Sequence, residues 1–184
     1  LDFGAAVKRS RQVSNRLTRG VGFLMKKNKI DVHMGTARLT GRDSVEVTDE
    51  KGETAAHKAK NIIVATGAST MLLPGVEIDG ERVVTYLEAI LQETLPKSVV
   101  IIGAGAIGVE FATIWSSYGT EVTLVEMLPS LVPMEDPEVG AELAKVFTKE
   151  GIKVMTGTAI MMPAPILSMR AARRTNRVRV RRGR

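Results

Sequence analysis

The apolar and polar positions between residues 29 and 157 alternate between two patterns that are typical of an α/β protein. The segments KIDVHMGTARLTG (29–41) and SVEVTDEKGETAAHKAKNIIVATG (44–67) contain short alternating or apolar runs between turn residues, which predict β-strands. The last of these strands is expected at the apolar run Ile62, Ile63, Val64 and Ala65. Pro74 and Gly75 then break the pattern, which predicts a linker and a domain boundary near residues 70–80.

A strand, helix, strand, helix, strand order follows this linker. Val99–Ile102 predicts a buried parallel strand, and residues from about Ala106 to Tyr118 predict a helix that ends at Gly119. EVTLVE (121–126) and IKVMTG (152–157) predict two further strands, and a capped helix is expected between them from about Pro137. The first helix is expected to bury the apolar side chains of Ile107, Phe111, Ile114 and Trp115.

The N-terminal residues predict an amphipathic helix with a basic polar face. Its apolar stripe is formed by Val13, Leu17, Val21 and Leu24, at helical spacing. We expect this stripe to dock on a core while the Lys and Arg side chains face solvent. A nucleic-acid-binding helix is the alternative, but this stretch has no interleaved aromatic residues that could stack on bases, so nucleic acid is not the expected partner.

The net charge of +6 comes from the two ends of the chain. Residues 1–30 contain eight basic residues and one acid, residues 31–157 contain ten basic residues and nineteen acids, and residues 158–184 contain eight arginines and no lysine or acid. The Arg-rich tail is expected to be disordered. Its abrupt change of composition suggests translation of a different reading frame, and a basic tail that binds polyanions is the alternative.

The composition excludes several kinds of chemistry for this polypeptide. Since it has no cysteine, it has no disulfide, no thiolate metal site and no cysteine nucleophile. Its two histidines, His33 and His57, are too far apart in sequence for a local metal motif, so we predict no metal site and no catalytic residue. No apolar run is long enough to cross a membrane and no signal peptide is visible at Leu1, so a cytoplasmic location is expected.

The segment GAGAIG after the first predicted parallel strand has the spacing of a dinucleotide-binding loop. Gly103 permits a tight turn, Gly105 lets the backbone approach a pyrophosphate, and Gly108 lets the helix pack close to the strand. The helix N-terminus offers N–H groups and a partial positive charge to the phosphates. The residues expected to bind the cofactor here are Gly103, Ala104, Gly105, Ala106, Ile107 and Gly108.

The last residue of the second parallel strand, Glu126, indicates which nucleotide this loop binds. A carboxylate at that position accepts hydrogen bonds from the adenosine ribose hydroxyls of NAD. Beside the 2′-phosphate of NADP it would place two negative charges together. The sequence therefore predicts NAD rather than NADP.

The order of these segments closely resembles the dihydrolipoamide dehydrogenases, which belong to the FAD-dependent pyridine nucleotide-disulfide oxidoreductases. The segments are GVGFLMKKNKIDVHMGTARL, KNIIVATGAS, LPGVEIDGERVVTYLEAI, residues 99–133 and GIKVMTGT, and the resemblance extends over residues 1 to about 157. It implies FAD and NAD as cofactors and two regions: the C-terminal part of an FAD-binding domain (1–75) and a truncated Rossmann-like NAD-binding domain (76–157). The Arg-rich tail (158–184), which is expected to be disordered, resembles nothing in the family. Both domains are expected to be incomplete.

The resemblance also assigns residues to FAD and to the nicotinamide. Gly35–Ala37 matches the loop that meets the adenine end of FAD, so Ala37 is a predicted FAD contact. Ala65, Thr66 and Gly67 match the segment that closes over that cofactor, and Glu110 matches the glutamate on the nicotinamide side of the nucleotide.

The family reaction implied is the NAD-dependent oxidation of protein-bound dihydrolipoyl groups through FAD. The implied partners are a lipoyl-bearing protein of a 2-oxoacid dehydrogenase complex and a second copy of the enzyme in a homodimer. The family's first FAD fingerprint, its redox cysteine pair and its interface domain have no counterpart in these 184 residues, so the isolated chain is expected to be inactive. Three alternatives stay open: another flavoprotein of the superfamily, such as an NADH oxidase or a mercuric reductase; a non-catalytic NAD-binding fragment; and a polyanion-binding protein.

Overall fold

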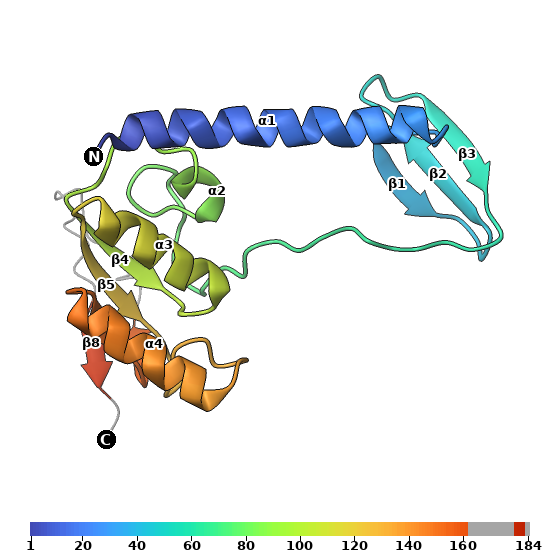
Figure 1. Ribbon diagram of the computed structural model, residues 1–184. Coiled ribbons are helices and arrows are strands. Elements are labelled where there is room, and N and C mark those ends of the chain that lie inside the picture. Colours follow the sequence, from blue (N-terminus) through green and yellow to red (C-terminus); the bar gives the residue numbers. More distant parts are fainter. Residues whose placement is uncertain (162–178, 183–184) are drawn as a thin grey trace, which may run out of the picture. The chain divides into compact units, whose positions relative to one another are not determined.

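The computed structural model describes residues 1–161 and 179–182, and it divides the chain into two compact units. One unit is Arg9–Ser69, and the other combines Leu1–Lys8 with the residues from Thr70 onward. Figure 1 shows their elements, with colours that follow the sequence. Helix α1 spans Phe3–Lys27 and therefore begins in one unit and ends in the other.

The Arg9–Ser69 unit contains a three-stranded antiparallel sheet. Strands β1 (Thr36–Leu39), β2 (Ser44–Thr48) and β3 (Thr54–Lys58) are neighbours in that order, as expected for alternating segments joined by short turns. The strand predicted at residues 62–65 is not formed, and the side chains of Ile63 and Val64 are exposed. A β-strand needs a neighbour to pair its backbone groups, and no strand among the described residues lies beside this segment.

The predicted N-terminal helix is present, and most of its apolar stripe is exposed in the structure. The side chains of Leu17, Val21 and Leu24 are 63%, 53% and 50% exposed. Burial is confined to the start of α1, where Val7 is buried and the Phe3 ring meets the Tyr118 ring edge to face at 5.2 Å. Apolar periodicity thus identified the helix, and of its stripe only Val13 is half-buried.

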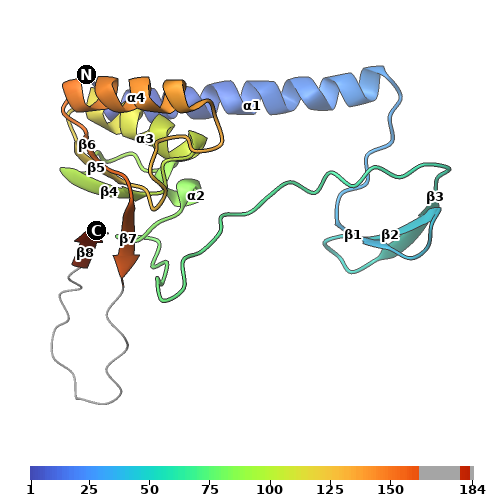
Figure 2. The same cartoon turned by 90° about the horizontal axis from the view of Figure 1, so that it is seen from below.

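The second unit is built on a parallel sheet with the order β4-β5-β6. Strand β4 (Ser98–Ile102) leads through α3 (Ala106–Ser117) to β5 (Glu121–Val125), and α4 (Pro137–Lys149) leads from there to β6 (Lys153–Met155). Both helices lie on the same face of the sheet (Figure 2). The α/β fold class expected from the sequence is confirmed.

The core of this unit lies between the sheet and its helices, and it corrects two sequence expectations. Strand β4 is buried on one face only, since Val100 and Ile102 are 57% and 47% exposed on the face without helices. In α3 the residues nearest the sheet are Gly108, Ala112 and Trp115, so Ile107 and Ile114 fall on the solvent side of the helix and are exposed rather than buried. The buried cluster consists of Ala89, Ala104, Ala112, Trp115, Val122, Leu124, Leu131, Val132, Phe147 and Ile152.

Local sequence signals explain where the remaining helices begin. Asp136 caps α4 by accepting a hydrogen bond from the Glu138 N–H at 2.9 Å, directly before Pro137. The short helix α2 (Tyr86–Ala89) begins with a capping box, in which the Thr85 backbone N–H donates to the Glu88 carboxylate at 2.7 Å.

The tail contains regular structure that the sequence did not predict. Strand β7 (Thr158–Met161) pairs with β8 (Arg179–Arg182) in an antiparallel ladder. The residues of β7 and β8 form strands, while residues 162–178 and 183–184, to which the predicted disorder of the tail also applies, lie outside the described part. Within the described part, no helix is both long and apolar enough to cross a membrane.

A pH-dependent turn precedes α2. The Asp79 carboxylate accepts hydrogen bonds from the backbone N–H groups of Val83, Glu81 and Arg82 at 2.8–2.9 Å. These donors stabilise the charged form, so the pKa of Asp79 is lowered below its ordinary value. Its contribution to stability is present above the unfolded-state pKa and is lost as the pH falls through the lower folded-state pKa.

We expect Asp79→Asn to lower the melting temperature at neutral pH, and to have a smaller effect once the pH has fallen below the folded-state pKa. Thermal unfolding of parent and variant across the acid range measures this. Glu77, an exposed carboxylate that accepts no hydrogen bond from the described residues, provides the control as Glu77→Gln. A destabilisation by Asp79→Asn that does not change with pH would contradict the assignment.

Candidate dinucleotide-binding site

The glycine-rich loop lies at the carboxyl end of β4, between the strand and α3 (Figure 1). The Gly103 N–H donates to the Val125 carbonyl oxygen at 2.8 Å, which continues the β4–β5 ladder by one residue. Gly105 is the N-cap of α3, and no side chain caps that helix end. In parallel sheets, ligands bind outside the carboxyl ends of the strands, which is where the loop lies.

At two of the three positions, the local backbone conformation or packing requires a glycine. Gly103 has a φ of +99°, a backbone conformation that side chains rarely adopt. A Cβ on Gly108 would overlap the carbonyl oxygen of Gly103, so the absence of a side chain lets α3 pack against the end of β4. These are the tight turn and the close helix packing that the sequence predicted.

Gly105 is different, because none of the described residues requires a glycine there. Its φ of −71° and ψ of −178° are open to any residue, and a Cβ would have no heavy atom within 4 Å. The space beside Gly105 is open and faces the uncapped helix end. A ligand could therefore lie directly against the backbone at Gly105.

The start of α3 leaves backbone donors for such a ligand. The helical hydrogen bond that closes its first turn runs from the Val109 N–H to the Gly105 carbonyl oxygen at 3.1 Å. The N–H groups of Ala106, Ile107 and Gly108 precede this bond and belong to the unsatisfied first turn of the helix. Gly105, Ala106 and Ile107 are exposed, so a pyrophosphate fits this end of α3 without displacing a side-chain cap.

Glu126 stands beside this loop at the end of β5, as the sequence predicted, and it makes contacts that the sequence did not reveal. Its Oε2 accepts a hydrogen bond from the Ala104 N–H and its Oε1 accepts one from the Leu128 N–H, both at 2.8 Å. The residue is 9% exposed. These two hydrogen bonds offset the free-energy cost of burying the charged carboxylate.

Ala104 is the one member of the predicted loop that is turned fully inward. It is 0% exposed, its N–H donates to Glu126, and its carbonyl oxygen accepts a hydrogen bond from the Val132 N–H at 2.8 Å. Both of its backbone polar groups are used within the protein. The exposed loop surface is therefore formed by the residues from Gly105 onward.

The other predicted site residues fall into both units. Glu110 lies in the second turn of α3 and is exposed, and its side chain has no hydrogen bond or ion pair to any described residue. Ala37 is opposite Val47 in the β1–β2 ladder. Ala65, Thr66 and Gly67 lie in the exposed stretch after β3, which has no helix or strand. The fold thus gathers the Gly103–Gly108 loop and Glu126, while the predicted FAD contacts lie in the Arg9–Ser69 unit.

The two histidines are brought together, which their separation in sequence did not reveal. The rings of His33 and His57 have centroids 4.1 Å apart, and the His57 Nε2 is buried without a hydrogen-bond partner among the described residues. His57 lies in β3 and His33 in the segment before β1, so the pair depends on strand pairing rather than on a motif. No group of three or more possible metal ligands occurs in the described residues.

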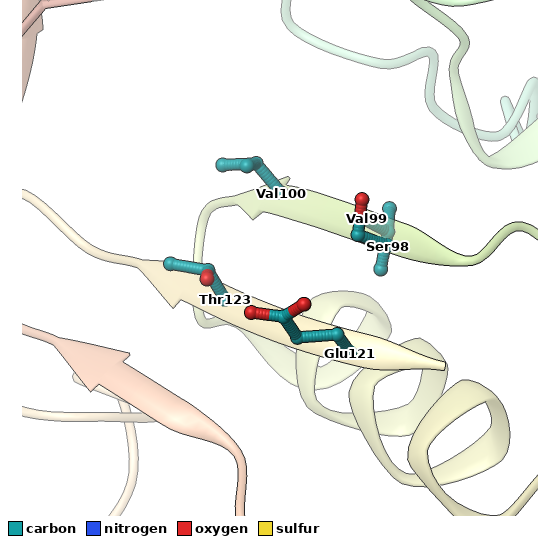
Figure 3. A pocket seen from close by; sticks show the side chains of 5 residues that line it. All are labelled: Ser98, Val99, Val100, Glu121 and Thr123. Carbon is teal, nitrogen blue, oxygen red and sulfur yellow. The ribbon is translucent and has the colours of Figure 1, made fainter. Parts of the chain in front are cut away.

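A hollow of about 280 Å³ lies on the open face of β4 and β5 (Figure 3). Its lining residues are Ser98, Val99, Val100, Glu121 and Thr123. Ser98 and Glu121 are the first residues of their strands, so the hollow lies at the amino ends of the sheet, opposite the glycine-rich loop. It is not part of the dinucleotide-binding site.

Comparison with known proteins gives a consistent result along most of the chain. A family model described as pyridine nucleotide-disulphide oxidoreductase matches residues 2–163. The chain is 45% identical over 174 residues to the dihydrolipoyl dehydrogenase of Rhizobium etli, an alignment that covers 86% of this chain and 36% of that protein. The chain spans about a third of the length of the curated relatives it matches.

Solved structures agree on the fold. LpdA from Mycobacterium tuberculosis superposes with a TM-score of 0.78 and 22% identity, covering 89% of this chain and 38% of that one. The HOCl-induced flavoprotein disulfide reductase RclA from Escherichia coli superposes with a TM-score of 0.72 and 26% identity, covering 87% and 36%. Each of these proteins is more than twice as long as the part that matches.

Proposed function

The chain belongs to the pyridine nucleotide-disulphide oxidoreductase family, and from this premise we propose that residues 98–126 are the NAD(H)-binding part of a dihydrolipoyl dehydrogenase. The complete enzyme would oxidise protein-bound dihydrolipoyl groups and reduce NAD, with FAD between them. The curated relatives at 43–48% identity, all named dihydrolipoyl dehydrogenase, support this activity over that of other flavoproteins. Family membership implies both FAD and NAD(H) as cofactors.

The observation that carries the nucleotide-binding proposal is the open space at Gly105. Gly103 and Gly108 have structural reasons to be glycine, so they would be found in any tight turn that packs a helix on a sheet. Gly105 has ordinary dihedral angles and free space around it. A ligand that lies against the backbone gives this glycine a function, and a pyrophosphate at the N-terminus of α3 has the required size and charge.

The choice of NAD over NADP rests on charge around the adenosine end. Glu126 directly follows β5 beside the loop, where a carboxylate can accept hydrogen bonds from ribose hydroxyls. No Lys, Arg or His occurs between residues 127 and 144, the segment that follows it. A 2′-phosphate would therefore meet one negative charge and no positive side chain from residues 127–144.

The FAD contacts and the partners belong to the same proposal. Ala37 and the exposed segment Ala65–Gly67 would meet FAD, and Glu110 would lie on the nicotinamide side of the nucleotide. A lipoyl-bearing protein of a 2-oxoacid dehydrogenase complex and a second copy of the enzyme are the proposed partners, and the cytoplasm is the proposed location. The 184 residues contain no cysteine, so thiol–disulfide exchange is not expected of this polypeptide alone.

Titration of the purified chain with NADH and NADPH, followed by calorimetry or nucleotide fluorescence, tests the proposal. We expect NADH to bind at least tenfold more tightly than NADPH, because unfavourable charge at the 2′ position costs on the order of 1.4 kcal/mol or more. Adenosine without phosphates serves as the control for non-specific stacking. Equal affinities would overturn the NAD assignment, and the absence of binding to either nucleotide would overturn the site.

A further inference from the structure

We propose that Glu126 is a positioning residue that holds the glycine-rich loop in the shape that receives the pyrophosphate, in addition to meeting the ribose. This inference rests on the proposed NAD site and concerns how that site is prepared. A residue that only contacted the ribose would affect binding through the ribose hydroxyls alone. The contacts of Glu126 connect it to the phosphate end as well.

The carboxylate joins two backbone segments that are far apart in sequence. Oε2 accepts from the Ala104 N–H in the loop, and Oε1 accepts from the Leu128 N–H after β5. The backbone of Glu126 is itself fixed, because its N–H donates to the Met155 carbonyl oxygen and its own carbonyl oxygen accepts from the Thr158 N–H, both at 2.9 Å. The acceptor therefore stands on the sheet rather than on a free loop.

Ala104 transmits this constraint to the phosphate end. It directly precedes Gly105, the N-cap from which α3 starts. Its N–H is held by Glu126 and its carbonyl oxygen by the Val132 N–H, so the peptide planes on both sides of Ala104 are fixed. These planes determine how the chain enters Gly105 and the first turn of α3, where the pyrophosphate would bind.

The second support of Ala104 comes from the segment before α4. Val132 has a φ of +40°, which is unusual for a β-branched residue, and it is buried with its N–H directed at Ala104. Gly140 of α4 permits this arrangement, because a Cβ there would come within 2.5 Å of the Leu131 carbonyl oxygen. The protein thus keeps Val132 in a strained conformation in which its N–H bonds to Ala104. This supports the inference that the shape of the glycine-rich loop is important for binding.

The two roles of Glu126 are compatible. Each carboxylate oxygen has two lone-pair directions, and each uses one for a backbone amide. On this proposal the remaining direction of each oxygen receives one ribose hydroxyl. The same side chain can hold the loop in the free protein and accept the nucleotide without first releasing the loop.

Removing the ribose hydroxyls from the ligand separates the two roles. The affinities of the parent chain and of Glu126→Gln are measured by calorimetry for ADP and for 2′,3′-dideoxy-ADP. A glutamine is uncharged and offers one acceptor oxygen, so it cannot receive both amides. We expect Glu126→Gln to lower the affinity for ADP about thirtyfold and the affinity for dideoxy-ADP about tenfold. The charge-assisted hydrogen bonds that hold the loop are lost with either ligand.

Amide hydrogen exchange gives a readout that a general loss of stability does not mimic. In Glu126→Gln, exchange at the Ala104 and Leu128 amides is expected to accelerate at least tenfold while amides in the middle of β5 keep their protection. Glu121→Gln, an exposed carboxylate at the other end of β5, is the matched control and should change neither exchange nor affinity. Glu126→Asp, which keeps the charge, replaces the glutamine variant if that variant does not fold.

The outcomes distinguish this inference from the proposed site. If the parent binds neither ADP nor NADH, the proposed function fails. If ADP binds and Glu126→Gln leaves dideoxy-ADP affinity unchanged, Glu126 acts through the ribose only and the positioning role is overturned. If dideoxy-ADP binds the parent too weakly to measure, unchanged exchange at Ala104 overturns it.

Discussion

A chain carrying Gly105→Val is expected to fold as the parent does and to bind NADH about a hundredfold more weakly. Valine is compatible with the backbone angles at this position, and its Cβ would enter open space rather than the protein. The same branched side chain would displace the pyrophosphate from the N–H groups of α3. Each charge-assisted hydrogen bond lost there is worth about 1.5–3 kcal/mol, so two of them account for the loss.

The measurement pairs an NADH titration with thermal unfolding. Gly105→Ala is an intermediate control, because its single methyl group should lower the affinity for NADH less than the valine side chain does. Both variants should unfold within a few degrees of the parent, since replacing an N-cap glycine by alanine or valine costs about 1 kcal/mol. If Gly105→Val bound NADH as the parent does, the nucleotide would not lie against this backbone, and the site assignment would be wrong.

The sequence predicted the part of the fold that depends on local periodicity. Apolar spacing, the glycines and Asp136 correctly predicted the positions of helices α3 and α4 and of strands β4–β6. These signals are local because caps and turns act within a few residues. The predicted loop and the predicted acid, Glu126, also meet in space, since they follow neighbouring parallel strands.

Burial was predicted less well, because it depends on which other surface covers an element. The Leu17, Val21 and Leu24 stripe of α1 has the same periodicity as a docked helix, yet it is exposed. Val100 and Ile102 follow the pattern of a strand buried on two faces, but helices cover only one face of this sheet. Residues 62–65 have the apolar character of a strand but no strand among the described residues to pair with.

Contacts between distant segments were outside what the sequence could reveal. The contact between the His33 and His57 rings joins strand β3 to the segment before β1, and no spacing rule predicts it. The internal hydrogen bonds of Ala104 depend on Glu126 and on the strained Val132, which are more than twenty residues away. The GAGAIG motif therefore marks a loop, and only the structure distinguishes the inward residue from those that face a ligand.

Gly108→Ala is expected to have the opposite profile to Gly105→Val, namely a large loss of stability. A Cβ at Gly108 would overlap the carbonyl oxygen of Gly103 and come within 3.1 Å of its carbonyl carbon. Backbone cannot rotate away as a side chain can, so α3 must move off β4 or the turn at Gly103 must open. Overpacking of this kind costs about 3 kcal/mol, or roughly 10 °C in melting temperature for a domain of this size.

Gly105→Ala is again the matched control for Gly108→Ala, because it adds the same methyl group to the same loop where no atom is within 4 Å. Chemical denaturation should give a large loss of free energy of unfolding for Gly108→Ala and a small one for Gly105→Ala. NADH affinity should fall in Gly108→Ala as well, since the displaced helix no longer directs its first N–H groups at the pyrophosphate. Equal stability of the two alanine variants would mean that α3 does not pack against Gly103 as the structure has it, and the separate reasons given for the two glycines would fail together.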